Sequence, residues 1–377
     1  MLSKLYSFYE GKKVLVTGHN GFKGSWLTLW LHRLGARVVG VSLKAEKGGL
    51  WDQLGLKIEK EYVADIRNQG EIYRIMAFEN PDVVFHLAAQ PLVRLSYDDP
   101  VMTYETNVMG TLNVLDAMRL LHIKNGVMIT TDKCYENNNL GFPFRETDPF
   151  GGDDPYSSSK GCCEILINSM RKSYKELNMI KSARAGNVIG GGDYAKDRIV
   201  PDFFRAQESG EILELRNPSS TRPWQHVLEP LFGYLLLGMM DTTPGFGVNF
   251  GPYPNGAKDV ATVISSLNSA CLKYKMSTVG VCYGQADTNK PEANLLQLDI
   301  TRAINKVGWK PVFSFEETID KIARWYYILK NGLRGIMGEH DYDVTYGLCA
   351  IDTAKAFYAC MRDIQDFEIE IIKEFGE

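Results

Sequence analysis

The segment Val14-Leu15-Val16-Thr17-Gly18-His19-Asn20-Gly21-Phe22-Lys23-Gly24 joins an apolar strand to a helix through three glycines. Missing side chains let a pyrophosphate approach the backbone, and the following helix N-terminus offers N–H groups and a partial positive charge. The pattern therefore predicts dinucleotide binding, against the alternative of a tight strand–helix corner without a ligand. The loop residues predicted to contact the dinucleotide are Gly18, Asn20, Gly21, Phe22, Lys23 and Gly24.

Short apolar strands alternate with amphipathic helices through the first half of the chain, which is typical of a parallel sheet covered on both faces. We therefore predict an α/β fold with a Rossmann-like doubly wound parallel sheet and a smaller mixed α/β domain. Helices are expected at about 101–121, with one apolar face, and near 228–240, fully buried. The strands are expected at 14–16, 38–41, 62–64, 83–87, 127–129 and 182–185.

The composition of the sequence changes after about residue 186, where Gly- and Pro-rich loops separate shorter helices and strands. We assign 1–186 to the dinucleotide-binding domain, with a return segment at about 223–252. The smaller domain takes 187–222 and 253–350, and 351–377 is expected to form a charged amphipathic helix that covers the surface.

Composition excludes several classes of protein. The net charge of −4 argues against nucleic acid as a partner, because phosphate binding needs a basic surface. The sequence has no apolar run of 18 residues and no signal peptide, so we predict neither a membrane span nor export. An odd count of seven cysteines fits reduced thiols in a cytoplasmic protein. The histidines lack the spacing of metal ligands, and no metal is predicted.

A second group of polar residues indicates proton and hydride transfer. Tyr156 and Lys160 stand four residues apart at a helix start, and Thr131 ends an apolar strand, at the edge where ligands bind in α/β sheets. A phenol is a poor base at neutral pH, and a nearby cation favours its ionised form. The structural alternative is a surface tyrosine and a solvated lysine.

The G-x-x-G-x-x-G spacing and the Tyr156/Lys160 pair resemble the extended short-chain dehydrogenase/reductase family. The resemblance implies that Asn107 is structural and that the tyrosine and lysine also contact the coenzyme. In this family an acidic residue usually ends the second strand and binds the ribose of NAD, but here Ser42 occupies that position. We favour NAD as the coenzyme. NADP remains the alternative, because Lys44 could bind its 2′-phosphate. Further coenzyme contacts implied by the resemblance are Asp65, Ile66, Leu87, Ala88 and Ala89.

Asp132 and Lys133, with the run 148–160, resemble the nucleotide-sugar 4,6-dehydratases, and within that group the branch that acts on CDP-glucose. The resemblance implies that Tyr156 takes the C4-hydroxyl proton, assisted by Thr131, that Asp132 protonates the departing 6-hydroxyl, and that hydride leaves C4 and returns to C6. Lys133 stands where the group has glutamate. It is predicted to remove the C5 proton, with electrostatic stabilisation of an enolate as the alternative.

Substrate contacts are expected mainly from the second half of the chain. Asn187 lies in a motif that resembles the family's R-x-x-N-V-x-G, and two guanidinium groups, Arg198 and Arg222, are suited to phosphate oxygens. Weaker candidates near the sugar are Gln90, Arg94, Ser96 and Tyr135.

Three other readings stay open: a 4,6-dehydratase of another nucleotide sugar, a nucleotide-sugar 4-epimerase, and a dinucleotide-sensing regulatory protein. The family resemblance also implies a homodimer through a four-helix bundle built from residues near 101–121 and 157–178. The product class would supply deoxysugars for surface polysaccharide, as in the lipopolysaccharide O-antigen.

Overall fold

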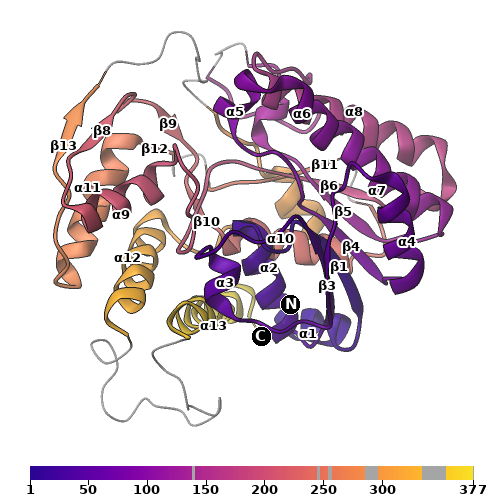
Figure 1. The fold of residues 1–377 in the computed structure, drawn as a ribbon, viewed down its shortest axis with the longest axis horizontal. Helices are drawn as coiled ribbons and strands as arrows, with labels where there is room; N and C mark the ends of the chain where they lie inside the picture. The colour runs from indigo at the N-terminus through magenta and orange to yellow at the C-terminus, as the bar shows by residue number, and fades with distance from the viewer. Residues whose placement is uncertain (138–140, 244–246, 254–256, 285–295, 333–353, 377) are drawn as a thin grey trace.

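The computed structural model describes residues 1–137, 141–243, 247–253, 257–284, 296–332 and 354–376 (Figure 1). Parts of the predicted smaller domain (254–256, 285–295 and 333–350) and of the predicted C-terminal helix (351–353 and 377) lie outside these residues.

Within the described residues, a seven-stranded sheet forms the centre of the molecule, in the order β11-β6-β5-β4-β1-β2-β3, with every neighbouring pair parallel. This confirms the predicted fold class. β4 and β5 are buried along their whole length, as apolar strands covered on both faces must be. The strands are β1 (Lys13–Thr17), β2 (Arg37–Ser42), β3 (Lys60–Val63), β4 (Val83–His86), β5 (Gly126–Ile129), β6 (Lys181–Ala185) and β11 (Gly247–Phe250).

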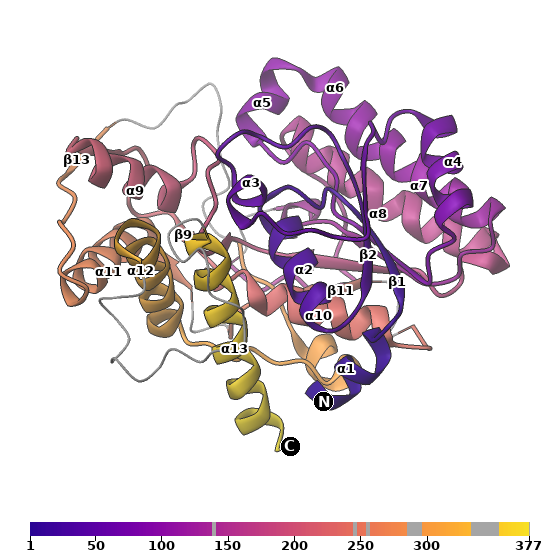
Figure 2. The same ribbon diagram turned by 60° about the horizontal axis from the view of Figure 1, so that its bottom comes forward.

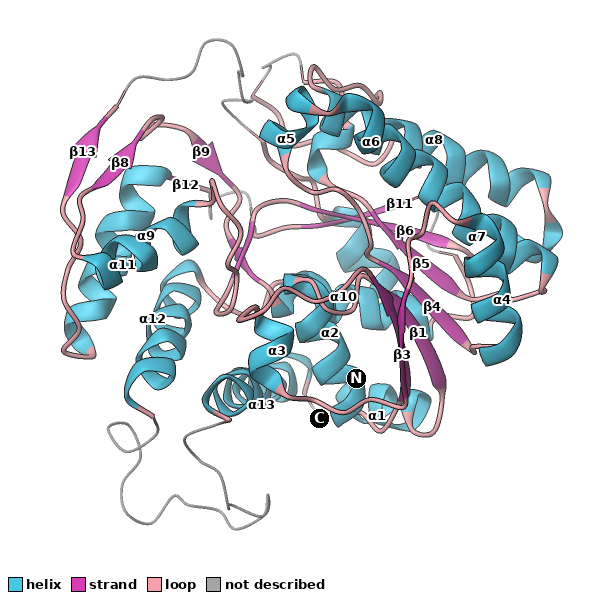
Figure 3. Cartoon of the chain, in the orientation of Figure 1, coloured by secondary structure: helices cyan, strands magenta, loops and turns pink. Residues whose placement is uncertain are grey.

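Helices cover both faces of this sheet (Figures 1 and 3). Successive side chains of β1 point to opposite faces of the sheet and therefore enter two different apolar cores. Val14 and Val16 pack in the core shared with α1, α2, α10 and α13. Leu15 packs in the core shared with α4, α7 and α8. The bounds are α1 (Leu2–Tyr9), α2 (Phe22–Arg33), α3 (Leu50–Leu54), α4 (Gln69–Glu79), α5 (Val93–Asp98), α8 (Pro155–Ser173), η3 (Lys175–Leu177) and α10 (Leu228–Met239).

The helix expected at about 101–121 forms, but it contains a π-helical turn in its middle. It consists of α6 (Pro100–Tyr104), a π-helical turn η1 (Glu105–Met109) and α7 (Gly110–Leu120). Asn107 lies in the π-helical turn, where its amide bridges backbone Gln90 and the Ser159 hydroxyl. The side chain in this π-helical turn thus links the loop after β4 to α8.

A smaller lobe surrounds a third apolar core and contributes two short strand pairs, β8–β13 and β9–β12 (Figure 1). A further pair, β7–β10, lies between this core and the large sheet. The elements are β7 (Val188–Ile189), α9 (Ile199–Ser209), β8 (Leu213–Leu215), β9 (Thr221–Arg222), β10 (Gln225–His226), β12 (Lys258–Asp259), α11 (Val260–Lys273), β13 (Val281–Tyr283), η5 (Ala303–Val307) and α12 (Phe315–Asn331).

The C-terminal helix α13 (Lys355–Phe375) contacts α12 of the smaller lobe and α1, α2 and α3 of the larger one (Figure 2). It is amphipathic as expected, but it does more than cover a surface. Its Glu368 is buried and accepts hydrogen bonds from Tyr6, Trp30 and Arg33. The helix therefore ties the lobes together. None of the helices among the described residues is long and apolar enough to cross a membrane.

Candidate active site

The glycine-rich loop closes tightly between β1 and α2. Gly18 has φ +72°, and a Cβ on it would lie 2.8 Å from the Ala88 nitrogen; a Cβ on Gly24 would lie 1.9 Å from the Gly18 carbonyl oxygen. Gly21 is the N-cap of α2, whose first turn carries no acidic residue. The α2 N-terminus therefore presents N–H groups without a competing carboxylate, which fits a pyrophosphate.

Polar groups border this loop at the ends of the next strands. The Ser42 hydroxyl donates to Asn20 Oδ1 at 2.7 Å, and Asn20 donates to the Leu43 carbonyl at 2.7 Å. Hydrogen bonds from Arg67 lower the pKa of Asp65, so its carboxylate is charged. Ile66 is buried nearby. A hydroxyl, an amide and a carboxylate thus line the place expected for the adenosine half.

The sequence analysis missed a buried polar chain under the end of β4. His86 Nδ1 lies 2.7 Å from the Thr17 hydroxyl and its Nε2 lies 3.1 Å from the Thr111 hydroxyl. Burial lowers the pKa of His86 to about 3, so the ring is neutral. The Thr17 hydroxyl in turn accepts from the Ala88 nitrogen at 3.2 Å, which holds the half-buried segment 87–89 against the loop. The sequence feature that indicates this buried polar chain is His86 itself, a histidine at the end of an apolar strand.

Thr131 and Asp132 follow β5 at the carboxyl edge of the sheet. Thr131 caps the short turn η2 (Asp132–Cys134), and its hydroxyl donates to Asp132 Oδ1 at 3.0 Å. Asp132 is only 2% exposed, and burial raises its pKa. Its Oδ2 has no hydrogen-bond partner among the described residues. Such a carboxyl group favours the protonated form and is suited to donate a proton to a ligand.

Lys133 is half-buried beside this acid. Its backbone N–H donates to the Thr131 hydroxyl at 3.4 Å, and its charge opposes the rise in the pKa of Asp132. The structure therefore brings Thr131, Asp132 and Lys133 into one short turn.

Tyr156 and Lys160 lie in the first turns of α8. Asp154 caps the helix by accepting from the Ser157 backbone, and Pro155 occupies the first turn, where a missing N–H costs nothing. Burial raises the pKa of Tyr156, and among its neighbours a hydrogen bond with Thr131 opposes this most. Tyrosine and threonine therefore meet as predicted from the sequence.

Among the neighbours that lower the pKa of Tyr156, the hydrogen bond with Thr131 acts most strongly, followed by the charge of Arg198. The Lys160 ammonium is buried and donates to the Ile129 carbonyl at 3.4 Å. Burial also lowers the pKa of Lys160 itself.

Cations from both lobes converge on Asp132. Burial lowers the pKa of Lys23 to about 8, and the charges of Arg198 and Lys160 act in the same direction while Asp132 opposes them. Arg198 pairs with Asp193 at 2.9 Å. Arg222 is 6% exposed, and its charge opposes the rise in the pKa of Asp132. Positive groups near the acid are suited to a diphosphate.

Two predicted substrate contacts, Tyr135 and Gln90, stay predictions, and the polar atoms of both side chains already bond to other residues of the chain. Tyr135 is buried, its hydroxyl donates to Asn249 at 2.7 Å and its ring stacks on Phe144 with centroids 5.0 Å apart. Gln90 is also buried; its amide donates to the Thr103 hydroxyl and its carbonyl accepts from backbone Leu92. Both hold loops in place. Sequence proximity to the site did not reveal which way the side chains point.

The remaining candidates occupy the rim or support it. Ser96 is fully buried, and its hydroxyl accepts from the Tyr156 backbone N–H at 3.1 Å, so it positions the tyrosine rather than facing the sugar. Arg94 is half-buried on α5, and Asn187 is half-buried in the link between β6 and β7. In the described residues, no group of three or more His, Cys, Asp or Glu side chains could hold a metal ion.

A buried ion pair behind the site was also missed. Glu164 and Arg184 are both fully buried and lie 2.8 Å apart. Glu164 also accepts from Thr130, next to the catalytic turn, and Arg184 donates to Tyr135. The signal was a glutamate four residues after Lys160, which places it one helical turn further along.

Comparison with known proteins identifies the family. The model of the GDP-mannose 4,6 dehydratase family matches residues 15–322. A CDP-glucose 4,6-dehydratase of Salmonella typhimurium is 43% identical over 335 residues, which cover 85% of this chain and 92% of the relative. A UDP-glucose 4-epimerase of Thermotoga maritima, solved with UDP-glucose, is similar with a TM-score of 0.72 at 25% identity, over 83% of this chain and 98% of that one.

A dTDP-glucose 4,6-dehydratase of Bacillus anthracis, solved in complex with NAD, shares the fold, with a TM-score of 0.73 at 20% identity over 85% of this chain and 97% of that one. The family match extends over most of the chain, including the glycine-rich loop, the Thr131–Lys133 turn and the Tyr156/Lys160 pair. The chain therefore belongs to the GDP-mannose 4,6 dehydratase family of short-chain dehydrogenases/reductases.

Proposed function

We propose that the protein is an NAD-dependent CDP-glucose 4,6-dehydratase, which converts CDP-D-glucose to CDP-4-keto-6-deoxy-D-glucose with loss of water. The Salmonella typhimurium relative supports the substrate, since identity of 43% extends over most of both chains. The observation that carries the dehydratase reaction is the buried Asp132, whose pKa is raised by burial and whose Oδ2 has no partner among the described residues, beside Tyr156 and Lys133.

Tyr156 would remove the proton of the C4 hydroxyl, with Thr131 holding the same hydroxyl. NAD, when bound at the glycine-rich loop, supplies an acceptor for the C4 hydride and later returns that hydride to C6. A 4-ketone acidifies the C5–H bond, so Lys133 would take the C5 proton while Asp132 protonates the 6-hydroxyl as it leaves as water. The C5=C6 bond then gains the hydride at C6 and a proton at C5. The charged neighbours Lys160, Arg198 and Arg222 would hold the coenzyme ribose and the substrate diphosphate.

A 4-epimerase is the second candidate, favoured by the structural likeness to a UDP-glucose 4-epimerase. Epimerisation returns hydride to C4 and expels no hydroxyl, so an acid such as Asp132 would have nothing to protonate. This difference favours the dehydratase.

Helices α6 and α8 and the turn η1 carry exposed apolar side chains that support the homodimer. The most exposed are Val101 (66%), Ile165 (59%) and Met109 (48%). A cavity lined by Pro100, Tyr104 and Cys162, among others, lies on the same face. We propose that this face forms the four-helix bundle of a dimer, and Val101→Glu should shift the mass measured by light scattering from dimer to monomer.

The division into domains stays a proposal as well: 1–186 with 223–252 for the coenzyme, 187–222 and 253–350 for the nucleotide sugar. The product would feed deoxysugar synthesis for surface polysaccharide.

The test is direct. Incubate the protein and NAD with CDP-glucose, dTDP-glucose, UDP-glucose and GDP-mannose, and follow the alkaline absorbance of a 4-keto-6-deoxy product. CDP-glucose should react fastest. A C4 epimer formed without loss of water would reject the dehydratase, and faster turnover of another substrate would reject only the nucleotide.

A further inference from the structure

Glu164 continues the four-residue spacing of Tyr156 and Lys160 along α8. Its carboxylate accepts a hydrogen bond from the hydroxyl of Thr130, which directly precedes Thr131. The three α8 side chains thus contact the end of β5 and the two residues that follow it. The first two of these side chains take part in the proposed reaction, whereas Glu164 is fully buried and has no role in it so far.

The Glu164 side chain is a carboxylate although it is withdrawn from water. Burial raises its pKa, but the charge of Arg184 and the hydrogen bonds from its three donors outweigh burial and hold the pKa below the ordinary value. The Ser182 hydroxyl and the Arg184 guanidinium, both from β6, lie 2.8 Å from its Oε2 atom. The carboxylate therefore joins α8 to β6 and to the segment after β5.

Arg184 in turn contacts the other end of the catalytic turn η2. Its guanidinium donates to the Tyr135 hydroxyl at 2.5 Å, and its Cζ atom lies 5.1 Å from the centre of the Tyr135 ring. Tyr135 is the C-cap of η2, and Thr131 is its N-cap. Thr130 and Tyr135 therefore stand at either end of the turn that carries Asp132, and both bond to the same buried ion pair.

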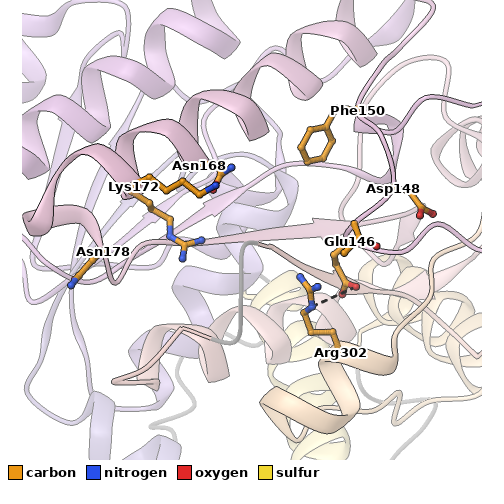
Figure 4. A pocket seen from close by; sticks show the side chains of 9 residues that line it. Glu146, Asp148, Phe150, Asn168, Lys172, Asn178 and Arg302 are labelled. Carbon is orange, nitrogen blue, oxygen red and sulfur yellow. Dashed lines mark ion pairs between the residues drawn. The ribbon is translucent and has the colours of Figure 1, made fainter.

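The far side of this ion pair contacts the loop 146–150. Arg184 donates to the Glu146 carbonyl at 3.4 Å, and its Cζ atom lies 4.9 Å from the centre of the Phe150 ring. Figure 4 shows these two loop residues and the ion pair, at 3.7 Å, between the Glu146 side chain and Arg302. The Arg184 guanidinium is fully buried among these groups, so it acts on the reaction only through its neighbours.

A glycine brings α8 close to the turn. A Cβ on Gly161 would lie 3.3 Å from the Cys134 carbonyl oxygen and 2.8 Å from that of Gly151. Because no gap separates the helix from the turn, a change in the contacts at either end of the turn displaces the side chains that the turn carries.

From these contacts we propose that Glu164 is a positioning residue of the dehydratase. Through Thr130 and Arg184 it holds both ends of the turn η2. Thr131 and Asp132 thereby keep their places in the site. The inference rests on the proposed function, because it concerns the groups to which that function assigns proton transfer.

The link between Thr130 and Glu164 is the point to test. Glu164→Gln removes the charge that faces Arg184, and the loss of stability would hide an effect on the reaction. Thr130→Val keeps the shape of the side chain and leaves the ion pair in place, but it removes the hydroxyl that donates to Glu164.

We expect kcat of Thr130→Val with CDP-glucose to fall about tenfold, because the reacting groups are displaced. KM for CDP-glucose and Kd for NAD, measured by isothermal titration calorimetry, should change less than about twofold, since Thr130 is buried against Glu164. Thr130→Ser keeps the hydroxyl and should return kcat to within about twofold of the wild type.

Ser182→Ala is the matched control. It removes a hydrogen bond to the same carboxylate, but the donor comes from β6 and not from the residue before the turn. The urea midpoint of Ser182→Ala should fall about as far as that of Thr130→Val, while its kcat stays close to that of the wild type.

An unchanged kcat in Thr130→Val, an equal loss of kcat in Ser182→Ala, or no recovery in Thr130→Ser would each overturn the proposal. The product of the wild-type enzyme tests the proposed function separately. A C4 epimer would reject that function alone, because Thr131 would serve oxidation at C4 in either reaction and the ratio of variant to wild-type kcat would still measure the positioning role.

Discussion

The Thr131 hydroxyl donates to Oδ1 of Asp132 at 3.0 Å, and Oδ2 of the same carboxyl group has no partner among the described residues. The threonine thus fixes the orientation of the acid and also reaches Tyr156. In the proposed reaction, this one hydroxyl would couple Tyr156, the base at C4, to Asp132, the acid at C6.

Asp132→Asn removes the proton donor but keeps the size of the side chain. Water loss should fall about 10²–10⁴-fold, the usual contribution of a general acid, whereas oxidation at C4 should survive. Rapid-quench analysis of the bound sugar would show a 4-ketoglucose that does not proceed. Asp153→Asn, at an exposed position in the loop before α8, is the control and should behave as wild type. Unchanged water loss in Asp132→Asn would remove the acid role.

Lys133→Met tests the base. Exchange of the C5 hydrogen with solvent should stop while C4 oxidation continues, because methionine fills the space without a titratable amine. Mass spectrometry of the sugar after incubation in D₂O measures the exchange. If exchange continues at the wild-type rate, Lys133 acts through its charge and another group takes the proton.

Ser96→Ala removes the acceptor for the Tyr156 backbone N–H. Loss of a hydrogen bond worth about 1 kcal/mol should lower kcat roughly fivefold. KM should change little, since the serine does not face the substrate. Ser96→Thr keeps the hydroxyl and should restore the rate. An increase in KM alone would instead support the original prediction that Ser96 contacts the sugar.

Glu368→Ala tests the C-terminal helix as a link between the lobes. The change leaves Arg33 and Trp30 without their buried partner and should cost about 3 kcal/mol of unfolding free energy. Urea unfolding followed by tryptophan fluorescence measures it. Glu370→Ala, on the same helix but paired only with Lys373 at the surface, should change stability by less than about 0.5 kcal/mol.

Glu229 predicts a dependence of stability on pH. Burial raises its pKa to about 8, although it accepts backbone hydrogen bonds from Val312 and Phe313. Between the ordinary value of 4.5 and about 8, the folded state holds a proton that the unfolded state has lost. This contribution to stability is therefore complete below pH 4.5 and disappears as the pH rises through about 8.

Glu229→Gln should flatten that part of the profile, because glutamine does not titrate. Urea titrations at pH 5, 6, 7 and 8 would show it, with Glu316→Gln on the exposed face of α12 as the control. A variant that loses as much stability with pH as the wild type would contradict the assignment.

The alternation of short apolar strands with amphipathic helices was enough to predict the parallel sheet, because strands buried on both faces, such as β4 and β5, are continuous apolar runs. The glycine-rich loop and the Tyr156/Lys160 pair could also be predicted from the sequence, since their chemistry depends on the local spacing of residues. What local spacing could not supply was orientation. Tyr135 points into a buried network with Asn249, 114 residues away along the chain, and no nearby residue signals this contact.

The π-helical turn at Asn107 shows the same limit, because the sequence of this segment has a regular helical pattern and Asn107 bonds to Gln90, 17 residues away along the chain. Lys23 is a further case: burial lowers its pKa most, and the charge of Arg198, which comes from the smaller lobe, lowers it further.

The fate of the hydrogen at C4 distinguishes a dehydratase from the alternatives. With CDP-glucose carrying deuterium at C4, we expect deuterium in the C6 methyl group of the product, seen by ²H NMR. Deuterium that remains at C4 of an epimer, or that is lost entirely to water, would contradict it.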